Sequence, residues 1–418
     1  MKILRFSWEN FRNLPSGEFS PNGGVNVLFG KNAQGKTNLL EAMWLFTGER
    51  SFRGARDAEM VGPLPRQAAL RLDFYGAGRE QTAAIRFLAG RRRAELNGVP
   101  KRSCSALIGA FQATVFSPDH LSLLQGGPAG RRNFLDAALS QIRPSYAASL
   151  ARYNRVLAQR NALLKEISRR PAGGLHPAGG LRSELLETLE VWDGRLVRAG
   201  QEVAARRRQY LEKIAVPAAQ FYSGMCRGRE SLDLIYEAST DSFEEDLAAC
   251  RGTDLATGHT GVGPHRDDMK VLVSGRDARA YASQGQKRSA VVAMKLAEAA
   301  VLTRESGEEP VVFLDDVLSE LDEERQSFLL ERLDRFQVFL TCTARCPRGQ
   351  APAQCLCGQA PDVKGTTPGG PSNLEDSEPP GSASAVPSGA ESETGCTRAL
   401  FHVEDGRIEP VGRRRPDT

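Results

Sequence analysis

The sequence lacks any apolar run close to the ~20 residues that a bilayer-spanning helix requires, which predicts a protein without a membrane span. Its first residues begin a β-strand and do not resemble a signal peptide. Eight cysteines among 418 residues do not form the dense framework of a small disulfide-rich fold. We therefore expect a reduced, cytoplasmic protein. The net charge of +4 says little by itself about an anionic partner.

Residue clusters with the spacing of a metal site are also lacking. His265 stands without other ligand types around it, and Cys355-x-Cys357 has only the irregularly spaced Cys346 and Cys396 as neighbours. A zinc site requires regular pairs of ligands, so none is expected here. Residues 344–395, where most of these cysteines lie, are rich in proline, glycine and serine. That composition predicts a disordered insertion.

The strongest positive signal is a glycine-rich stretch between a strand and a helix. It follows the pattern G-x-x-x-x-G-K-[ST] at every fixed position, after an apolar run at 25–29 and before a helical pattern at 38–46. Backbone N–H groups of such a loop surround phosphate oxygens, and the helix N-terminus adds partial positive charge. We predict a site for ATP, in which Lys36 reaches the β/γ-phosphates and Thr37 binds Mg²⁺. The loop residues are Gly30, Lys31, Asn32, Ala33, Gln34, Gly35, Lys36 and Thr37.

Two basic segments flank this loop in the sequence. Arg12 lies in the turn after the first strand, where contact with phosphate and simple solvation are both reasonable interpretations. The segment 51–56 is basic and turn-like, and we expect it near the nucleotide. Further on, 91–93 is a run of three arginines before Asn97-Gly98, a hairpin signal. A solvated hairpin edge explains that run most simply, and DNA contact is the alternative.

A second phosphate-binding helix end and a pair of acids follow far downstream. Ser283-x-Gly285-Gln286 directly precedes a helix predicted over 289–303, so it offers a hydroxyl and backbone N–H groups at a helix N-terminus. The apolar run 310–314 reads as a buried strand that ends in Asp315-Asp316. This is the Walker B arrangement. Asp315 would hold Mg²⁺ and Asp316 would orient or activate the attacking water.

Between these two parts the pattern becomes helical and basic. Apolar residues recur at a spacing of three and four over 146–167 and again over 185–214, interrupted by Arg160 and Arg206. A linker at 168–177 separates them, so we expect an antiparallel hairpin of two helices of twenty-odd residues, each ~30 Å long. Residues 121–230 hold 18 Lys/Arg against 9 Asp/Glu, a net charge of +9.

A net charge of +9 on one lobe has two interpretations. The simple one is helix faces that favour arginine, and the other is a groove for a polyanion. We predict DNA contact, because the lobe is attached to an ATPase. The candidates are Arg169, Arg170, Arg206, Arg207 and Arg208.

The order of these parts gives the fold prediction. We expect an α/β protein: an ABC-type P-loop ATPase head with mixed sheets and an inserted helical-hairpin lobe. The predicted divisions are the N-terminal half of the head (1–120), the basic lobe (121–250), the C-terminal half (251–343), the disordered insertion (344–395), and a last strand with a basic tail (396–418).

In combination, these strings resemble the bacterial RecF family, an ABC-type branch of the SMC/Rad50 class. The short hairpin argues against SMC and Rad50 themselves. The similarity covers about residues 1–343 and extends to the last strand. The strings are Phe11-Arg12-Asn13, Gly30 to Thr37, Val115-Phe116-Ser117-Pro118-Asp119, Arg131-Arg132-x-Phe134-Leu135-Asp136, Gly263-Pro264-His265-Arg266-x-Asp268, Ser283-x-Gly285-Gln286-x-Arg288 and Leu314-Asp315-Asp316-x-x-Ser319-Glu320-Leu321-Asp322.

The resemblance implies an ATP-dependent DNA-binding protein of recombinational repair. RecF proteins recognise gapped DNA at junctions of single and double strands, and they work with RecR and RecO to bring RecA to DNA. The family also implies an ATP-dependent homodimer. In it, Ser283, Gly285 and Gln286 would close on the γ-phosphate bound by the other protomer.

Two departures shape the expected activity. Transport-type ABC ATPases carry Glu after the Walker B Asp, whereas Asp316 stands here, and no switch histidine follows Leu340, where Thr341 and Thr343 stand. A shorter carboxylate reaches the attacking water less well. We therefore expect slow DNA-dependent hydrolysis and a nucleotide-gated DNA clamp.

Other functions fit the sequence less well. The nucleotide-binding subunit of a transporter or of another ABC-type assembly is the main alternative, and the basic lobe and Asp316 argue against it. A DNA-binding protein with a vestigial nucleotide site would not retain Lys36, Thr37, Asp315 and Ser283 together. A P-loop kinase would lack the Ser-x-Gly-Gln turn.

Overall fold

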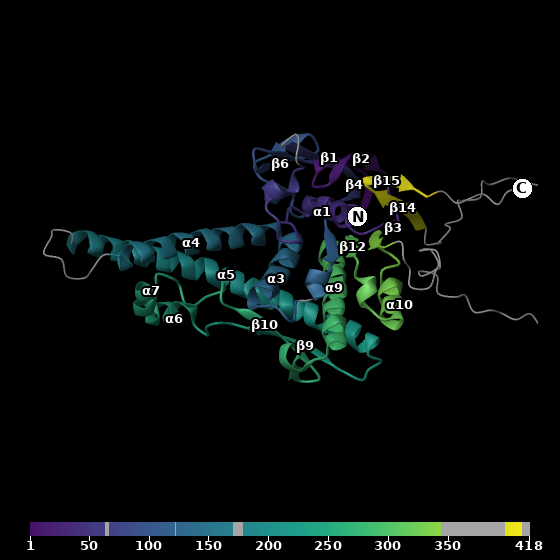
Figure 1. The fold of residues 1–418 in the computed structure, drawn as a ribbon. Coiled ribbons are helices and arrows are strands. Elements are labelled where there is room, and N and C mark those ends of the chain that lie inside the picture. Colours follow the sequence, from purple (N-terminus) through teal and green to yellow (C-terminus); the bar gives the residue numbers. More distant parts are fainter. Residues whose placement is uncertain (63–66, 122, 170–178, 344–397, 412–418) are drawn as a thin grey trace, which may run out of the picture.

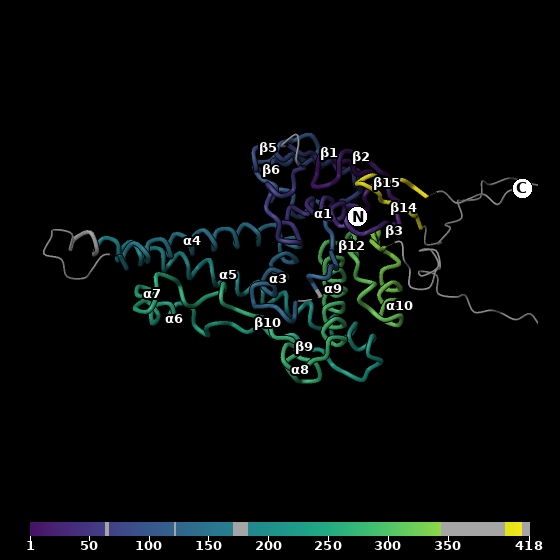
Figure 2. The backbone as a smooth tube through the Cα atoms, viewed as in Figure 1, coloured from purple at the N-terminus to yellow at the C-terminus, as the bar shows by residue number. Residues whose placement is uncertain are grey.

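The computed structural model describes residues 1–62, 67–121, 123–169, 179–343 and 398–411 (Figure 1). The predicted insertion 344–395, its cysteines and most of the linker 168–177 therefore lie outside the described residues. The described residues form three sheets, a pair of long helices and several shorter helices. The sheets form a head, and the pair of long helices projects from it as an arm (Figures 1 and 2).

The central sheet is built from strands that are far apart in the sequence. Its order is β15-β14-β3-β13-β12-β8, in which β14, β3, β13, β12 and β8 are parallel and β15 is antiparallel to β14. Continuous apolar runs such as Val-Val-Phe-Leu are typical of parallel strands that are buried on both faces. The bounds are β3 Val25–Phe29, β8 Ala113–Phe116, β12 Val311–Asp315, β13 Val338–Cys342, β14 Arg398–Glu404 and β15 Arg407–Pro410.

This sheet separates two hydrophobic cores. On β12, Val312 and Leu314 pack into the core shared with α9 (Gln284–Ser306) and the arm, whereas Val311 and Phe313 pack into the opposite core with α1 (Lys36–Trp44). Side chains alternate between the faces of a strand, so one five-residue run serves both cores. The inserted helices thus bury their apolar side against one face of the head.

An antiparallel sheet covers the other face, in the order β2-β1-β4-β5-β6-β7. The predicted Asn97-Gly98 turn is confirmed: both residues have positive φ, 51° and 76°, as a two-residue hairpin requires. The arginine run 91–93 lies at the start of β6, at the end of the strand away from this turn. The bounds are β1 Lys2–Phe11, β2 Leu14–Phe19, β4 Gln67–Gly76, β5 Arg79–Leu88, β6 Arg91–Leu96 and β7 Val99–Lys101.

The remaining elements connect the arm to the head. A three-stranded sheet, β11-β10-β9, lies along the base of the arm (Figure 1). Its strands are β9 Leu232–Glu237, β10 Asp268–Val273 and β11 Arg276–Asp277, and the helices are α2 Pro118–Leu121, α3 Pro128–Ile142, α4 Pro144–Ser168, α5 Gly179–Met225, α6 Phe243–Ala249, α7 Arg251–Thr257, α8 Ala278–Tyr281 and α10 Glu323–Arg332.

Helix α5 is longer than the sequence predicted. Helix α4 has 25 residues, as expected, but α5 has 47, which corresponds to ~70 Å at 1.5 Å per residue. The prediction of two matched helices in a compact lobe is therefore wrong. The apolar series over 185–214 marks only part of α5. The helix continues past Pro217 because Ala218 and Tyr222 are fully buried in the core that contains α9.

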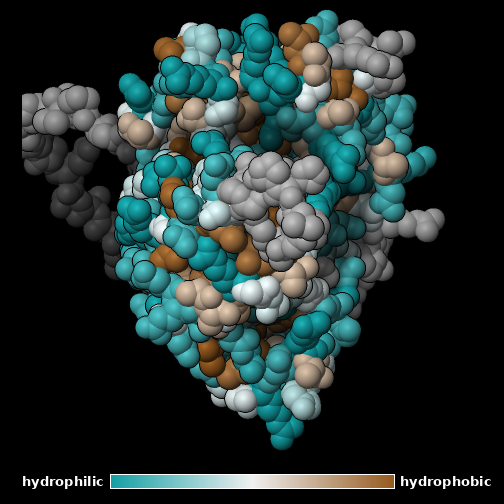
Figure 3. Space-filling view, turned by 90° about the vertical axis from the view of Figure 1, so that its left-hand side faces the viewer, coloured by the Kyte–Doolittle hydropathy of each residue, from teal (hydrophilic) through white to brown (hydrophobic). Residues whose placement is uncertain are grey.

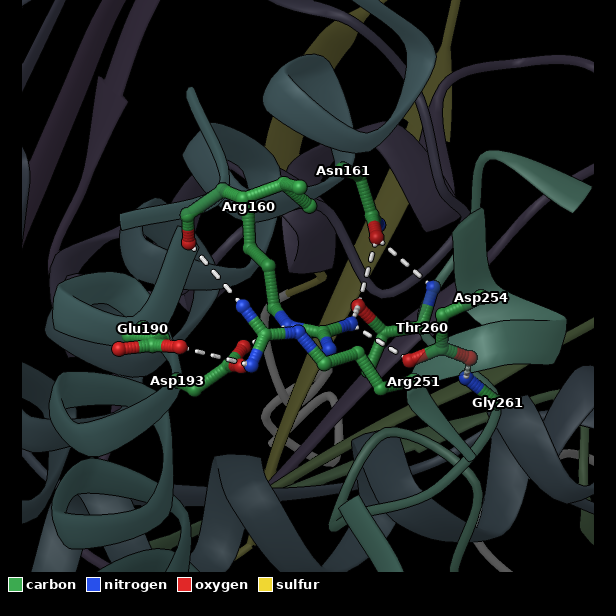
Figure 4. A network of polar contacts seen from close by, with 9 residues as sticks. Arg160, Asn161, Glu190, Asp193, Arg251, Asp254, Thr260 and Gly261 are labelled. Atoms are coloured by element: carbon green, nitrogen blue, oxygen red, sulfur yellow. Dashed lines mark hydrogen bonds and ion pairs between the residues drawn. The ribbon is translucent and has the colours of Figure 1, made fainter. Parts of the chain in front are cut away.

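A buried arginine joins α4, α5 and α7 in the outer part of the arm (Figure 4). Arg160, fully buried, donates to Asp193 on α5 at 2.6 Å, to Asp254 on α7 at 2.6 Å and to Thr260 at 2.8 Å. Asn161 accepts from Thr260 as well. The residue that interrupts the apolar series of α4 thus occupies a core position. A buried charge is tolerated there because two carboxylates surround it.

The part of the chain that the structure describes contains no helix with the length and apolar character of a membrane span. Seen from the side of the arm tip, the surface is largely hydrophilic, with hydrophobic residues scattered singly (Figure 3).

Removal of the buried arginine tests its role in the arm. Arg160→Met should lower the free energy of unfolding by roughly 3–5 kcal/mol, because it leaves Asp254 buried without its cation. Arg155→Met, an exposed position on the same helix, is the matched control and should be close to neutral. Denaturant unfolding followed by circular dichroism measures both.

The double variant R160M/D254N should recover part of the loss, since it removes the uncompensated charge. Equal stability of Arg160→Met and Arg155→Met would contradict a stabilising role for this network.

Candidate nucleotide-binding site

The phosphate loop joins β3 to α1 and depends on two glycines. A Cβ on Gly30 would lie 2.2 Å from the carbonyl oxygen of Val403, and one on Gly35 would lie 2.6 Å from a methyl group of Leu14. Gly35 also has φ of +106° and accepts the first helical hydrogen bond, from Leu39 N–H at 2.9 Å. Only glycine fits both positions. The loop therefore has the cradle shape that phosphate binding requires.

Lys36 lies inside this cradle. Its ammonium donates to the carbonyl oxygens of Gly30 at 2.6 Å and Lys31 at 2.7 Å, and the residue is buried. Burial lowers the pKa of Lys36, against the opposing effect of Asp315 and Asp316 nearby. A cation held among loop carbonyls can exchange these contacts for phosphate oxygens.

The two Walker motifs meet at the edge of the central sheet. Thr37 Oγ1 donates to Asp315 Oδ1 at 2.8 Å, although the residues are 278 positions apart in the sequence. Thr341, at the end of the neighbouring strand β13, also donates to Asp315 Oδ1, at 3.0 Å. Burial raises the pKa of Asp315, and the two hydroxyl donors oppose that shift. A hydroxyl and a carboxylate side by side are the oxygen ligands that Mg²⁺ prefers.

Asp316 is exposed and has a strained backbone. Its φ of +52° is in the left-handed region, which Asp tolerates better than most residues, and its N–H donates to Thr341 Oγ1 at 2.9 Å. Ser319 Oγ donates to its carbonyl at 2.7 Å. Such conformations cluster at functional sites. Thr341 therefore positions both acids, although the sequence marked it only by the absence of a histidine.

The side chain of Arg12 is held in an ion pair and does not extend freely toward the phosphate loop. Its guanidinium pairs with Glu41 of α1, a fully buried carboxylate, at 2.5 Å and 2.9 Å. Arg53, from the predicted basic segment 51–56, lies 3.8 Å from the same carboxylate and donates to Asn38 at 2.8 Å. These two arginines thus line α1, and Arg12 carries an ion pair that the sequence did not predict.

Asn13 is a further loop contact that sequence reasoning missed. Its side-chain amide donates to Ala33 O at 2.9 Å and accepts from Asn38 at 2.7 Å. Its place directly after Arg12 in the Phe-Arg-Asn string was the available signal.

The second predicted phosphate-binding end is a well-formed helix cap. Ser283 Oγ accepts from Gln286 N–H at 3.2 Å, and Gln286 Oε1 accepts from Ser283 N–H at 2.8 Å. Helix α9 therefore begins at Gln284, earlier than the predicted 289. The helix starts beside α8 and runs toward β12 (Figure 2), so its N-terminal end, which Ser283 caps, is the end away from α1. Among the described residues, no hydrogen bond connects this cap to the phosphate loop.

The predicted DNA contacts on α5 do not form one surface. Arg207 is buried and forms a bidentate pair with Asp136, at 2.8 Å for each bond, and donates to Pro264 O at 2.6 Å. Its prediction as a DNA contact is wrong for this structure. Arg206 and Arg208 flank it, and successive helical residues point ~100° apart. Arg207 therefore occupies the buried position that the helical spacing of apolar residues assigned to Arg206.

The other candidates differ in their surroundings. Arg208 is exposed and lies over the ring of Tyr236, with 5.7 Å to the ring centroid. Arg169 is exposed at the end of α4, and Arg170 lies outside the described residues.

The outward face of α4 is more uniformly basic than the predicted sites. Exposed Ala158 and Ala162 lie between the cations along it, and within the described chain none of these cations has an ion pair. Glu166 is the one acid of the helix and is partly buried. We call this surface the basic face of α4. Its cations are Arg152, Arg155, Lys165 and Arg169.

Within the described ranges, no three His, Cys, Asp or Glu side chains are arranged to hold an ion. His265 instead bonds the hydroxyl of Tyr153 at 2.7 Å and the carbonyl of Thr260 at 3.1 Å.

Thr341 offers a test of how the site is held. Thr341→Val should destabilise the protein by about 1–3 kcal/mol, because Asp315 loses a donor and Asp316 N–H loses its acceptor. Thr114→Val on β8, another strand of the central sheet, is the control, since the Thr114 hydroxyl is buried with no partner among the described residues. That change should be neutral or stabilising. Thermal unfolding of both variants decides, and an equal loss in the two would refute the role of Thr341.

Comparison with known proteins agrees with this architecture, although no family model matches the chain. The DNA replication and repair protein RecF of Agathobacter rectalis is 38% identical over 346 residues, which is 82% of this chain and 92% of that protein. RecF of Heliobacterium modesticaldum is 39% identical over 358 residues, with the same shares of the two chains, 82% and 92%.

Solved structures give the same result. A structure of the recombination mediator protein RecF with ATP, from the RecFOR pathway, is 30% identical with a TM-score of 0.77, and the match covers 98% of each chain. The Smc head domain of Pyrococcus furiosus, at 14% identity and a TM-score of 0.50, shares the fold alone. The ABC-type ATPase head expected from the motif order is thereby confirmed. By its sequence identity over most of both chains, this protein belongs to the RecF family of DNA replication and repair proteins.

Proposed function

We propose that this protein is an ATP-dependent DNA-binding protein of recombinational repair, which forms a homodimer on ATP and holds gapped DNA. The observation that carries the proposal is the contact of Thr37 with Asp315, which unites both Walker motifs in one site. Hydrolysis is expected to be slow. The protein would act mainly as a nucleotide-gated clamp.

The residues at the phosphate loop fit Mg-ATP. The glycine cradle supplies backbone N–H groups, Lys36 supplies a buried cation, and Thr37 with Asp315 supplies adjoining oxygen ligands for Mg²⁺. When bound, ATP would release free energy through hydrolysis of its γ-phosphate bond. Asp316, exposed beside this pair, is the residue suited to orient a water. A solved relative in this family is described with ATP, which supports the assignment.

The proposal of a dimer rests on the position of Ser283. Its cap is a second anion-binding helix end, and it has no bond to the loop of its own chain among the described residues. Two copies arranged head to head would bring Ser283, Gly285 and Gln286 of one protomer to the phosphates of the other. A nucleotide shared in this way couples binding of ATP to closure of the clamp.

DNA is the proposed ligand of the arm. The basic face of α4 carries four cations, and from Arg152 to Arg169 it spans ~26 Å at 1.5 Å per residue. Exposed alanines between the cations allow a phosphate backbone to approach closely. Arg206 and Arg208 remain secondary candidates, because they point to different sides of α5. The face carries no base-reading pattern, so we expect recognition of the DNA backbone.

The proposed partners follow from the family. A solved relative acts in the RecFOR pathway, and we infer that this protein works with RecR and RecO, and through them with RecA, in the cytoplasm. The nucleotide-binding subunit of a different ABC-type assembly remains the alternative.

Dimerisation is tested by analytical ultracentrifugation. With Mg²⁺ and a non-hydrolysable ATP analogue the protein should sediment as a dimer, and without nucleotide as a monomer. Ser283→Arg should remain monomeric in both conditions, because a bulky side chain would fill the space needed by the partner's phosphates. Ser274→Arg, an exchange in the β10–β11 turn, is the control and should dimerise normally. A wild-type protein that stays monomeric with nucleotide would favour the alternative function.

The basic face is tested through the salt dependence of DNA binding. Arg155→Ala with Arg169→Ala should weaken binding to gapped duplex and reduce the slope of log K against log[salt] by up to about 2, since ~0.9 is lost for each duplex phosphate contact. Arg195→Ala on α5, whose guanidinium lies over Trp192, is the matched control. Fluorescence anisotropy over a salt series measures the slopes, and an unchanged slope in the double variant would place the DNA elsewhere.

A further inference from the structure

The turn of the C-terminal hairpin contacts the phosphate loop from outside. Asp405 N–H donates to the side-chain oxygen of Gln34, and Gly406 N–H donates to the backbone oxygen of Gln34 at 3.1 Å. Gln34 lies in the middle of the loop, 371 positions before Asp405. Two backbone donors from the end of the described chain are therefore committed to one loop residue.

The same hairpin packs closely on both sides of this contact. A Cβ on Gly406 would lie 2.6 Å from Asn13 O and 2.7 Å from the ring of Pro15, and Gly30 touches the backbone of Val403. The hairpin is itself held firmly, because β14 pairs with β3 and Val403 is fully buried. The turn is thus a rigid support, fixed to the strand that carries the loop.

A second turn, in contact with the hairpin, also holds the loop. Asn13 from the β1–β2 turn donates to Ala33 O at 2.9 Å, and Leu14 fills the space beside Gly35. A loop that binds phosphate through backbone N–H groups gains affinity when its conformation is fixed in advance. Support from both turns provides that fixation.

We propose that Asp405-Gly406 is a positioning element of the nucleotide site, which sets the shape of the phosphate loop without touching the nucleotide. The proposal rests on the proposed function, since it assumes that the loop binds ATP. The C-terminal hairpin thus contributes to nucleotide binding, although it lies outside the phosphate-loop motif. Loss of the turn contact should weaken binding of ATP and ADP alike, because both depend on the same loop.

The chain offers a matched pair of glycines for the test. Gly406 and Gly98 both follow Asp or Asn in a hairpin turn, with φ of +73° and +76°, but a Cβ on Gly98 meets no atom within 4 Å. Alanine at either position costs the same backbone strain, and only Gly406→Ala pushes the turn off the loop. Gly406→Ala should bind Mg-ATP about tenfold more weakly, from the loss of two hydrogen bonds. Gly98→Ala should bind as the wild type does.

Titration of a fluorescent ATP analogue measures the affinities. Thermal unfolding shows whether a variant has also lost stability. The rise of the unfolding midpoint on adding nucleotide should shrink in Gly406→Ala alone, whereas DNA binding without nucleotide should be unchanged. Gln34→Met, of similar length but without the acceptor, should lose about fivefold in affinity. This second variant decides the matter if Gly406→Ala does not fold.

The outcomes separate the two proposals. Failure of the wild type to bind Mg-ATP would remove the proposed function. If the wild type binds and both Gly406→Ala and Gln34→Met bind equally well, the positioning role alone is overturned.

Discussion

The contact between Thr37 and Asp315 depends on a simple property of parallel sheets. The carboxyl ends of neighbouring parallel strands lie at one edge, so β3, β12 and β13 deliver the phosphate loop, the Walker B acids and Thr341 to the same place. The register pairs Asp315 with Thr341 directly. Because Asp315 is buried, its charge requires these donors. A shift of the β12 register by one residue would point the carboxylate of Asp315 into a hydrophobic core.

The insertion of a long arm does not disturb this site, because the central sheet keeps two cores apart. Apolar residues of α5 and α9 pack on one face, and α1 and the antiparallel sheet pack on the other. The arm contains two buried arginines: Arg160 lies between Asp193 and Asp254, and Arg207 is paired with Asp136. These pairs specify how α4, α5 and the 254–268 segment fit together, since an unpaired partner would be costly.

Much of the fold could be predicted from local patterns. The strand-loop-helix of the phosphate site, the Asn97-Gly98 hairpin and the strand ending in Asp315 each depend on signals within ten residues, and each is found. Predictions that needed three-dimensional neighbours were less successful. Arg207 was predicted to be solvated because no residue close to it in the sequence indicates its pairing with Asp136. The predicted α5 was too short because the C-terminal part of this helix packs against α9 and not against α4.

The sequence by itself determined the chemistry of the site and the order of the parts, because phosphate loops, helix caps and buried acid-ended strands are specified by short runs of residue types. Only the tertiary structure decided which of those parts meet. In the folded protein Thr37 contacts Asp315, Arg12 pairs with Glu41, Ser283 caps the N-terminus of α9, and Asp405-Gly406 contacts Gln34. Contacts across hundreds of residues follow from sheet order and burial, and no local spacing encodes them.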